Sequence, residues 1–189
     1  PRENLYARPY EATYPWDLLE ATRQLLGAGL VDEQAHESGV YVHETARVHE
    51  DATLQGPVVV GPDAEIAAGV VVGPDTAVGR NITVEANATI ERSLVGADTR
   101  VGSGATLCDC VTGMAGEIGP GVVVPGGETD VRIGTDIHEG ERLGAVVGDR
   151  VTLAGGSTLG PGTLLGVGAT VGVGAIARDH VAAGAEVVR

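Results

Sequence analysis

Residues 60–89 read VGPDAE, IAAGVV, VGPDTA, VGRNIT and VEANAT, which are five consecutive blocks of six residues that each begin with an aliphatic side chain. The same phase starts at Val42 and slips twice over residues 90–118, first in a block shortened by one residue. After a gap over about residues 125–146, six more blocks follow from Val147. The fifth position of the early blocks is small or aliphatic as well: Ala46, Ala52, Val58, Ala64, Val70, Thr76, Ile82 and Ala88.

A period of six matches neither the 3.6-residue turn of a helix nor one long strand. It matches a short strand followed by a turn, repeated three times per coil, so that residues 18 apart stack on one wall of a triangular prism. Each coil then buries its Val, Leu and Ile side chains by lying on the next coil. We therefore predict an all-β parallel β-helix over residues 39–189, with a loop insertion at about 125–146.

Glycine takes the second position of ten blocks, and we expect these glycines to form corners with positive φ, which glycine tolerates without a Cβ penalty. They are Gly61, Gly73, Gly79, Gly96, Gly102, Gly119, Gly148, Gly160, Gly166 and Gly172.

The hexapeptide repeat resembles the left-handed parallel β-helix of hexapeptide-repeat acyltransferases. This resemblance covers roughly residues 40–189. It implies left-handed winding, which is an exception to the usual right-handed crossover.

Residues 1–38 follow another pattern. Pro15 suits the first position of a helix, and residues 14–26 read YPWDLLEATRQLL, with Leu18, Leu19, Leu25 and Leu26 expected on one apolar face. We expect this helix to be a cap that covers the open end of the first coil, whose sheet edge would otherwise be unpaired. The string also resembles the helix that closes the nucleotidyltransferase domain of sugar-1-phosphate nucleotidyltransferases, just before their β-helical tail.

The whole chain thus resembles the C-terminal portion of a two-domain enzyme. The Gly-rich nucleotide-binding loop and the metal-binding Asp of the nucleotidyltransferase half are missing from these 189 residues. We therefore expect this chain alone not to transfer nucleotides.

The composition excludes several classes of partner. The chain carries 26 acidic and 12 basic residues, all of the latter Arg, for a net charge of −14. Such a surface does not suit nucleic acid, and no apolar run is long enough for a membrane span. The acids are dispersed, which favours a cytoplasmic protein of a halophilic archaeon or another high-salt cell over an acidic mimic of nucleic acid.

The cysteines and histidines predict no metal site. Cys108 and Cys110 are too close for an ordinary disulfide and too few for structural zinc, so we expect buried or semi-buried thiols in a reducing compartment. His43 and His49, six residues apart, fall on neighbouring walls. They lack the third histidine that zinc-dependent γ-type carbonic anhydrases assemble on the same kind of prism.

The C-terminal blocks resemble the closing coils of acetyl-CoA-dependent hexapeptide enzymes. The resemblance implies a homotrimer in which acetyl-CoA lies in the groove between two prisms. By position, Gly155 and Val173 would line that groove, and the Arg178 guanidinium would contact the CoA phosphates.

The catalytic position of these acetyltransferases is altered here. They use a His as general base, with a Tyr and an Asn nearby, and the corresponding residues are Ser103, Thr106 and Gly126. Serine has no acceptor that titrates near neutral pH, so Ser103 cannot replace imidazole. His138, in the long insertion, is the remaining candidate base.

Arg132 and Arg142 lie in the same insertion and are candidate partners of a sugar phosphate; the alternative for this segment is a solvated loop or a trimer contact. Two functions follow. One is acetyl transfer from acetyl-CoA to a sugar phosphate, with His138 as base. The other is a catalytically degenerate β-helix that trimerises and acts as a scaffold or regulator for a nucleotidyltransferase domain. A flat-walled prism predicts closed cyclic association in both cases.

Overall fold

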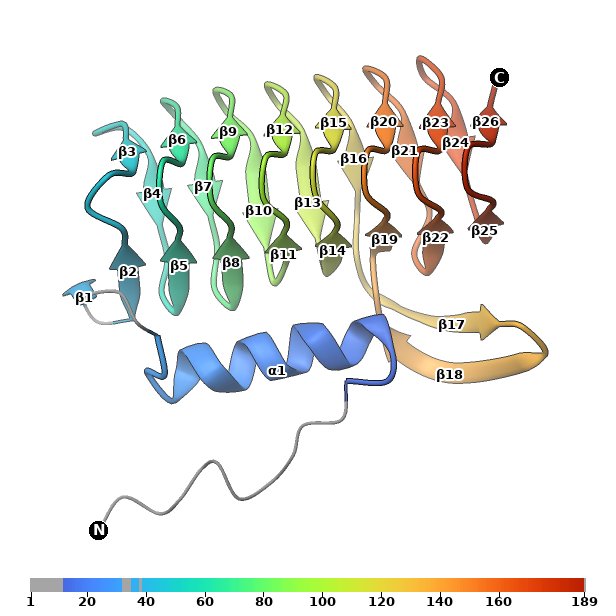
Figure 1. The fold of residues 1–189 in the computed structure, drawn as a ribbon, viewed down its shortest axis with the longest axis horizontal. Coiled ribbons are helices and arrows are strands. Elements are labelled where there is room, and N and C mark those ends of the chain that lie inside the picture. The colour runs from blue at the N-terminus through green and yellow to red at the C-terminus, as the bar shows by residue number, and fades with distance from the viewer. Residues whose placement is uncertain (1–11, 32–34, 38, 189) are drawn as a thin grey trace, which may run out of the picture.

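The computed structural model describes residues 12–31, 35–37 and 39–188, which form a triangular prism of short strands with a helix and a hairpin beside it (Figure 1). Helix α1 spans Pro15–Gly27. Wall A contains β1 (Ala35–Glu37), β2 (Val40–Val42), β5 (Val58–Val60), β8 (Thr76–Val78), β11 (Leu94–Val95), β14 (Cys110–Thr112), β19 (Ala145–Val147), β22 (Thr163–Leu165) and β25 (His180–Val181).

The other two walls repeat the same short strands. Wall B contains β3 (Arg47–Val48), β6 (Glu65–Ile66), β9 (Thr83–Val84), β12 (Arg100–Val101), β15 (Glu117–Ile118), β20 (Thr152–Leu153), β23 (Thr170–Val171) and β26 (Glu186–Val187). Wall C contains β4 (Thr53–Leu54), β7 (Val71–Val72), β10 (Thr89–Glu91), β13 (Thr106–Cys108), β16 (Val123–Val124), β21 (Thr158–Leu159) and β24 (Ile176–Ala177). The predicted parallel β-helix is confirmed.

The hexapeptide phase accounts for the core. The first residues of every third block pair across coils, as Val42 does with Val60 and Val60 with Val78. Ile90 and Leu107, which open blocks at the two slips, are 0% exposed. The core therefore consists of aliphatic columns that run along the prism, which is how a chain without Phe buries an apolar interior.

The expected role of the second-position glycines was wrong. None of the ten has positive φ; in the described full-length blocks that conformation falls on the fourth position, for example at Asp63 (57°) and Asn87 (60°). Most of the ten instead lie against the backbone of the next coil. A Cβ on Gly61 would come 2.9 Å from the carbonyl carbon of Gly79, and one on Gly148 equally close to a backbone oxygen. These glycines therefore allow successive coils to stack closely.

Helix α1 forms where expected, but it is not a cap on the open end. It lies along wall A and contacts β8, β11 and β14 (Figure 1). Leu26 is 5% exposed, whereas Leu18 and Leu25 remain 39% and 43% exposed, so the leucines do not form one buried face. The edge of wall A at β2 is paired by β1 in antiparallel orientation instead.

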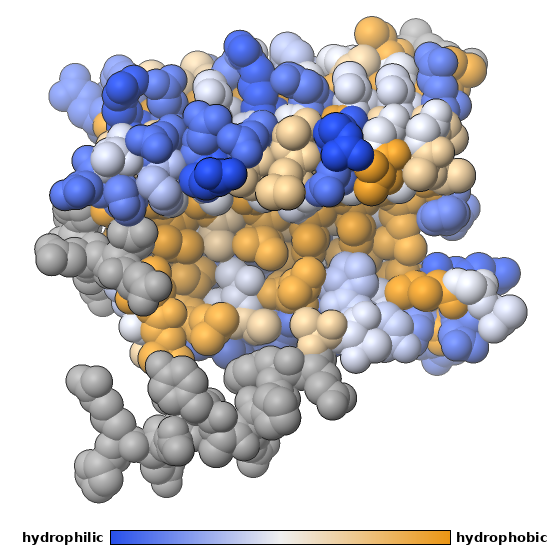
Figure 2. Space-filling model, in the orientation of Figure 1, coloured by the Kyte–Doolittle hydropathy of each residue, from blue (hydrophilic) through white to orange (hydrophobic). Residues whose placement is uncertain are grey.

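The outer surface of wall A explains this position of the helix. Ala77, Leu94 and Val111 pair in one row, and they point outward because their strand neighbours point into the core. Wall B has charged residues such as Glu65 and Arg100 in the equivalent row. Figure 2 shows the apolar band that runs along the prism beside more polar surface. The helix covers apolar surface that lies on the side of the prism.

The insertion forms a β-hairpin, where a loop was expected. Strands β17 (Glu128–Ile133) and β18 (Asp136–Arg142) pair in antiparallel fashion around a two-residue turn that contains Gly134, with φ of 62°. The hairpin leaves the prism between walls C and A, near the start of α1 (Figure 1). Val131 on β17 is 1% exposed, so the hairpin packs on the rest of the molecule. No helix in the described part is long and apolar enough to cross a membrane.

Candidate functional site

The corner between walls C and A places Asp75, Arg92 and Asp109 on successive coils, and we call these three residues the corner stack. Their spacing is 17 residues, because the blocks that contain Arg92 and Asp109 are each shortened by one residue. All three have positive φ, of 57°, 46° and 52°. This conformation is costly for an arginine, but it recurs at other corners of the prism, for example at Arg150 (55°), and so belongs to the repeat.

Asp109 is the buried centre of the stack, with a side chain that is 2% exposed. Its Oδ1 accepts a hydrogen bond from Nε of Arg92 at 2.7 Å. Its Oδ2 accepts one from the backbone N–H of Gly127 at 2.9 Å and lies 3.5 Å from a guanidinium nitrogen of Arg142. The carboxylate thus joins the corner to both ends of the hairpin, and its charge is compensated.

Arg92 is held as a cation by the same contact. Its hydrogen bond to Asp109 raises the pKa of the Arg92 guanidinium further. A second nitrogen contacts Oε2 of Glu91 at 3.1 Å. These two contacts fix the orientation of the Arg92 guanidinium. Its other terminal nitrogen has no hydrogen bond to a described residue and can donate to a ligand.

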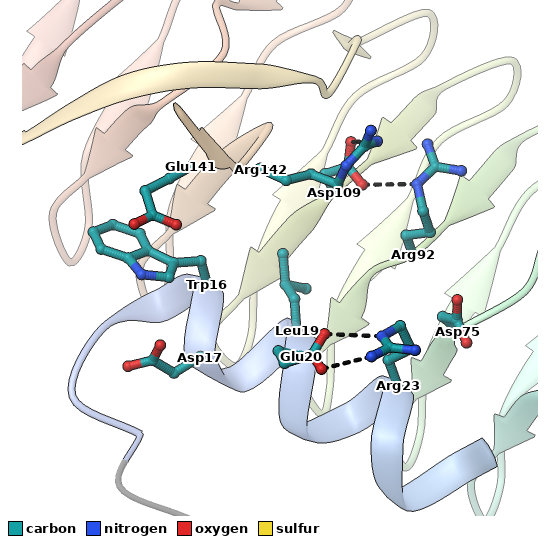
Figure 3. Close-up of a pocket in the computed structure, with 10 residues that line it drawn as sticks. All are labelled: Trp16, Asp17, Leu19, Glu20, Arg23, Asp75, Arg92, Asp109, Glu141 and Arg142. Carbon is teal, nitrogen blue, oxygen red and sulfur yellow. Dashed lines mark hydrogen bonds and ion pairs between the residues drawn. The ribbon is translucent and has the colours of Figure 1, made fainter. Parts of the chain in front are cut away.

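A cleft of about 440 Å³ lies between the corner stack, the base of β18 and helix α1 (Figure 3). Its lining residues come from these three elements: Trp16, Asp17, Leu19, Glu20, Arg23, Asp75, Arg92, Asp109, Glu141 and Arg142. On the helix side, Glu20 accepts hydrogen bonds from Arg23 at 2.8 and 2.6 Å. These bonds, together with one from Gln24, lower the pKa of Glu20 to about 2.

The start of α1 is fastened to the hairpin by an aromatic cluster of Tyr14, Trp16 and His138. The Tyr14 and Trp16 rings stack with centroids 4.8 Å apart, and the His138 ring lies 4.3 Å from Tyr14 and 5.1 Å from Trp16. Oδ2 of Asp17 accepts hydrogen bonds from the backbone of Tyr14 (2.8 Å) and Thr13 (2.9 Å) and so caps the helix. Of the three rings, Trp16 lines the cleft.

His138 is thus placed for packing. Its Nε2 is buried and has no hydrogen-bond partner among the described residues. A general base must reach the proton that it removes, and this nitrogen is buried. Arg142 lines the cleft, but Arg132 lines another, of about 560 Å³, together with Ile137 and His180. The hairpin separates the two arginines that the sequence grouped.

The residues expected to bind acetyl-CoA fall on two corners of the prism. Gly155 and Val173 stack between walls B and C, where the N–H of Gly174 donates to the carbonyl of Gly155 at 3.1 Å and Val173 is 74% exposed. Arg178 lies on another corner, between walls C and A. Within one chain these residues therefore do not form one site.

The residues at the acetyltransferase catalytic positions are also apart. Ser103 is on the corner between walls B and C, where its N–H donates to Oε2 of Glu85 at 3.1 Å. Gly126 lies at the base of the hairpin, and a Cβ there would come 2.5 Å from Oδ2 of Asp109. Any larger residue at 126 would displace the Asp109 carboxylate, so this glycine makes room for the corner stack.

The thiols offer no reactive nucleophile. Burial raises the pKa of Cys110 to about 12, and burial also raises the pKa of the half-buried Cys108. This confirms the expected burial. No group of three or more His, Cys, Asp and Glu in the described part of the chain is arranged to hold a metal ion.

Sequence reasoning missed the corner stack and Trp16. The signal was present, because the two shortened blocks make the spacing of Asp75, Arg92 and Asp109 17 where the repeat requires 18. A shortened block removes a corner residue, and the charged residue left behind takes the positive φ.

Comparison with known proteins identifies the repeat. A family described as the GMPPB C-terminal domain matches residues 36–159. No curated protein sequence gives a significant match.

Among solved structures, UDP-N-acetylglucosamine acyltransferase from Campylobacter jejuni is similar, with a TM-score of 0.50 and 14% identity over 77% of this chain. The chain spans 66% of that protein. The acetyltransferase domain of PglB from Neisseria gonorrhoeae, in complex with acetyl coenzyme A, has a TM-score of 0.41 and 19% identity over 89% of this chain and 62% of that one. A putative acetyltransferase from Bacillus cereus has a TM-score of 0.44 and 17% identity, over 79% of this chain and 77% of that one. The Campylobacter comparison confirms the left-handed β-helix of hexapeptide-repeat acyltransferases.

Proposed function

The chain belongs to the GMPPB C-terminal domain family, the β-helical C-terminal part of sugar-1-phosphate nucleotidyltransferases, and we propose that it acts as a scaffold that steadies a nucleotidyltransferase domain. The observation that carries this proposal is the fastening of α1. The helix resembles the one that closes a nucleotidyltransferase domain, and it lies across β8, β11 and β14 with its start held by His138. A domain attached through this helix takes its orientation from the prism.

The placement of the candidate catalytic residues favours a scaffold over a transferase. His138 packs against the stacked rings of Tyr14 and Trp16 with Nε2 buried, and Arg142 lies 3.5 Å from Asp109. Arg132 lines a different cleft. These residues support the prism and the helix more directly than they support a reaction.

We include homotrimer formation in this proposal. The outer row of wall C and its corner with wall B expose Val123 (37%), Ile176 (58%) and Val173 (74%), whereas wall B carries charges in its outer row. Exposed aliphatic residues on a flat wall suit contact with a second copy, and closed cyclic symmetry is the common result. Light scattering should give about three times the chain mass of 19.1 kDa. A monomer mass in molar salt would contradict the trimer.

Limited trypsin digestion tests the fastening of the helix. Arg23 lies within α1, so cleavage after it requires the helix to unfold locally. His138→Ala removes the ring that holds Tyr14 and Trp16 and should accelerate this cleavage several-fold. His49→Ala, at an exposed histidine on another corner, is the matched control. Equal cleavage rates in wild type and His138→Ala would refute the scaffold role of the cluster.

Acetyl transfer to a sugar phosphate is the second candidate, and the open corner at Gly155 and Val173 favours it. In this alternative Gly155, Val173 and Arg178 bind acetyl-CoA, Arg132 and Arg142 hold the phosphate, and His138 is the base. His138→Ala should then lower turnover on amino-sugar phosphates by about 10²-fold, while CoA binding is unchanged. If calorimetry detects no CoA binding to wild type, this alternative fails and the scaffold remains.

A further inference from the structure

We infer that the cleft between α1 and the corner stack binds an uncharged, hydroxyl-rich ligand of the monosaccharide class. The inference uses the geometry of the cleft alone and goes beyond a scaffold role. The volume of about 440 Å³ is in the range of small-molecule sites, and the lining combines an aromatic ring with convergent polar groups.

The charge of the cleft argues against a phosphate. Three arginines and five carboxylates line it, so the fully ionised lining has a net charge of −2. Arg23 is paired with Glu20, and Arg92 with Asp109. Of the three cations only Arg142 has a loose contact, at 3.5 Å. A phosphate would bring further negative charge into a lining in which carboxylates already outnumber guanidinium groups.

The remaining hydrogen-bonding capacity suits hydroxyl groups. Figure 3 shows Glu141 and Asp75 at opposite ends of the cleft, with Arg142, Asp109 and Arg92 in a row between them. Arg92 and Arg142 can donate from nitrogens that no described residue occupies, and the two end carboxylates can only accept. A hydroxyl group both donates and accepts, so several on one ring can satisfy both kinds of partner.

The apolar side of the cleft comes from α1. Trp16 and Leu19 are half-buried and lie across from the row of charged residues (Figure 3). A sugar ring has apolar C–H surface between its hydroxyl groups, and an indole provides an apolar surface of matching size. Because one side of the cleft is α1 and the other is the prism, a ligand that touches both would tighten the fastening of the helix.

Trp16 makes the test direct, because it is the single tryptophan of the chain. Titration of the protein with D-glucose, D-mannose or D-galactose to about 0.1 M covers millimolar dissociation constants. We expect a saturable change of Trp16 fluorescence with at least one hexose. Inorganic phosphate at the same concentration and ionic strength should give no saturable change.

Matched variants assign the binding to the cleft. Glu141→Gln and Asp75→Asn remove the end carboxylates and should each weaken hexose binding by about tenfold or more, the usual effect of losing a hydrogen bond to a charged group. Glu139→Gln, on an exposed residue of the same strand, and Asp63→Asn, with the same φ of 57° as Asp75, are the controls.

Three results would overturn the inference: no saturable response to any of the three hexoses, tighter binding of phosphate than of hexose, or equal weakening by the control variants. The oligomer mass and the cleavage rate at Arg23 are measured without ligand. Failure of this inference is therefore distinguishable from failure of the scaffold function.

Discussion

Replacing Asp109 by asparagine tests whether the corner stack holds the molecule together. Asn tolerates the φ of 52° at this position, and its side-chain oxygen can still accept the N–H of Gly127. The amide nitrogen of Asn then faces Arg92 and cannot accept its N–H, so the substitution removes both the negative charge and the acceptor of that hydrogen bond. Arg92, whose Nε donates to this carboxylate at 2.7 Å, loses its nearest counter-charge.

The expected cost follows from the burial of the two partners. A hydrogen bond to a charged group contributes about 1.5–3 kcal/mol, and the 2% exposure of the Asp109 side chain gives little solvent screening on that side. The Arg92 side chain is 35% exposed, so water compensates part of the loss. We expect Asp109→Asn to lower the free energy of unfolding by about 2 kcal/mol. For a chain of this size that corresponds to a Tm lower by about 4–8 °C.

Thermal unfolding followed by circular dichroism measures this effect. Asp98→Asn is the matched control, because Asp98 also has a positive φ, of 59°. Its ion pair with Arg80, at 3.7 Å, is more exposed, since the Asp98 side chain is 41% exposed. This substitution should lower the free energy of unfolding by less than about 0.5 kcal/mol. In a double-mutant cycle with Arg92→Asn we expect a coupling of about 1–2 kcal/mol between the two sites. A Tm for Asp109→Asn within 1 °C of wild type, or an equal loss for Asp98→Asn, would refute the reasoning.

Three further outcomes are expected. Gly96→Ala should destabilise the prism by more than about 3 kcal/mol in urea unfolding, because the added Cβ would overlap the backbone of the next coil. Gly104→Ala has open space around the added Cβ but a φ of 66°, so it should destabilise the prism by only about 1–2 kcal/mol. The pKa of Glu20 is lowered from 4.5 to about 2, so the stability that its ionised form contributes is present above pH 4.5 and lost as the pH falls toward 2. Because the Glu20–Arg23 ion pair is exposed, Glu20→Gln should lower the free energy of unfolding by less than about 0.5 kcal/mol at neutral pH. It should have no effect at pH 2, in unfolding followed by Trp fluorescence. Since burial raises the pKa of both thiols, Cys108 should react slowly with a thiol reagent at about pH 8 and Cys110 only on unfolding, so rapid labelling of both in the folded protein would contradict the burial.

The hexapeptide phase by itself determined the prism and its core. Every sixth residue returns to the inside of a strand whatever lies elsewhere in the chain, so Ile90 and Leu107 could be placed in the interior from local spacing alone. The same holds for α1, whose start at Pro15 follows from local helix signals. These features depend on backbone geometry within a few residues.

Tertiary structure alone decided where these pieces meet. Helix α1 lies on wall A because the outer row there, from Ala77 to Val111, is apolar, and this row is assembled from strands more than 50 residues further along the chain. Arg132 and Arg142 are separated along the hairpin, because Arg132 pairs with Ile137 near the turn and Arg142 pairs with Glu128 at the base. The cleft joins Trp16, Arg92 and Glu141 from three distant segments. A repeat specifies which side chains point inward, but the partners of those that point outward are set only by long-range packing.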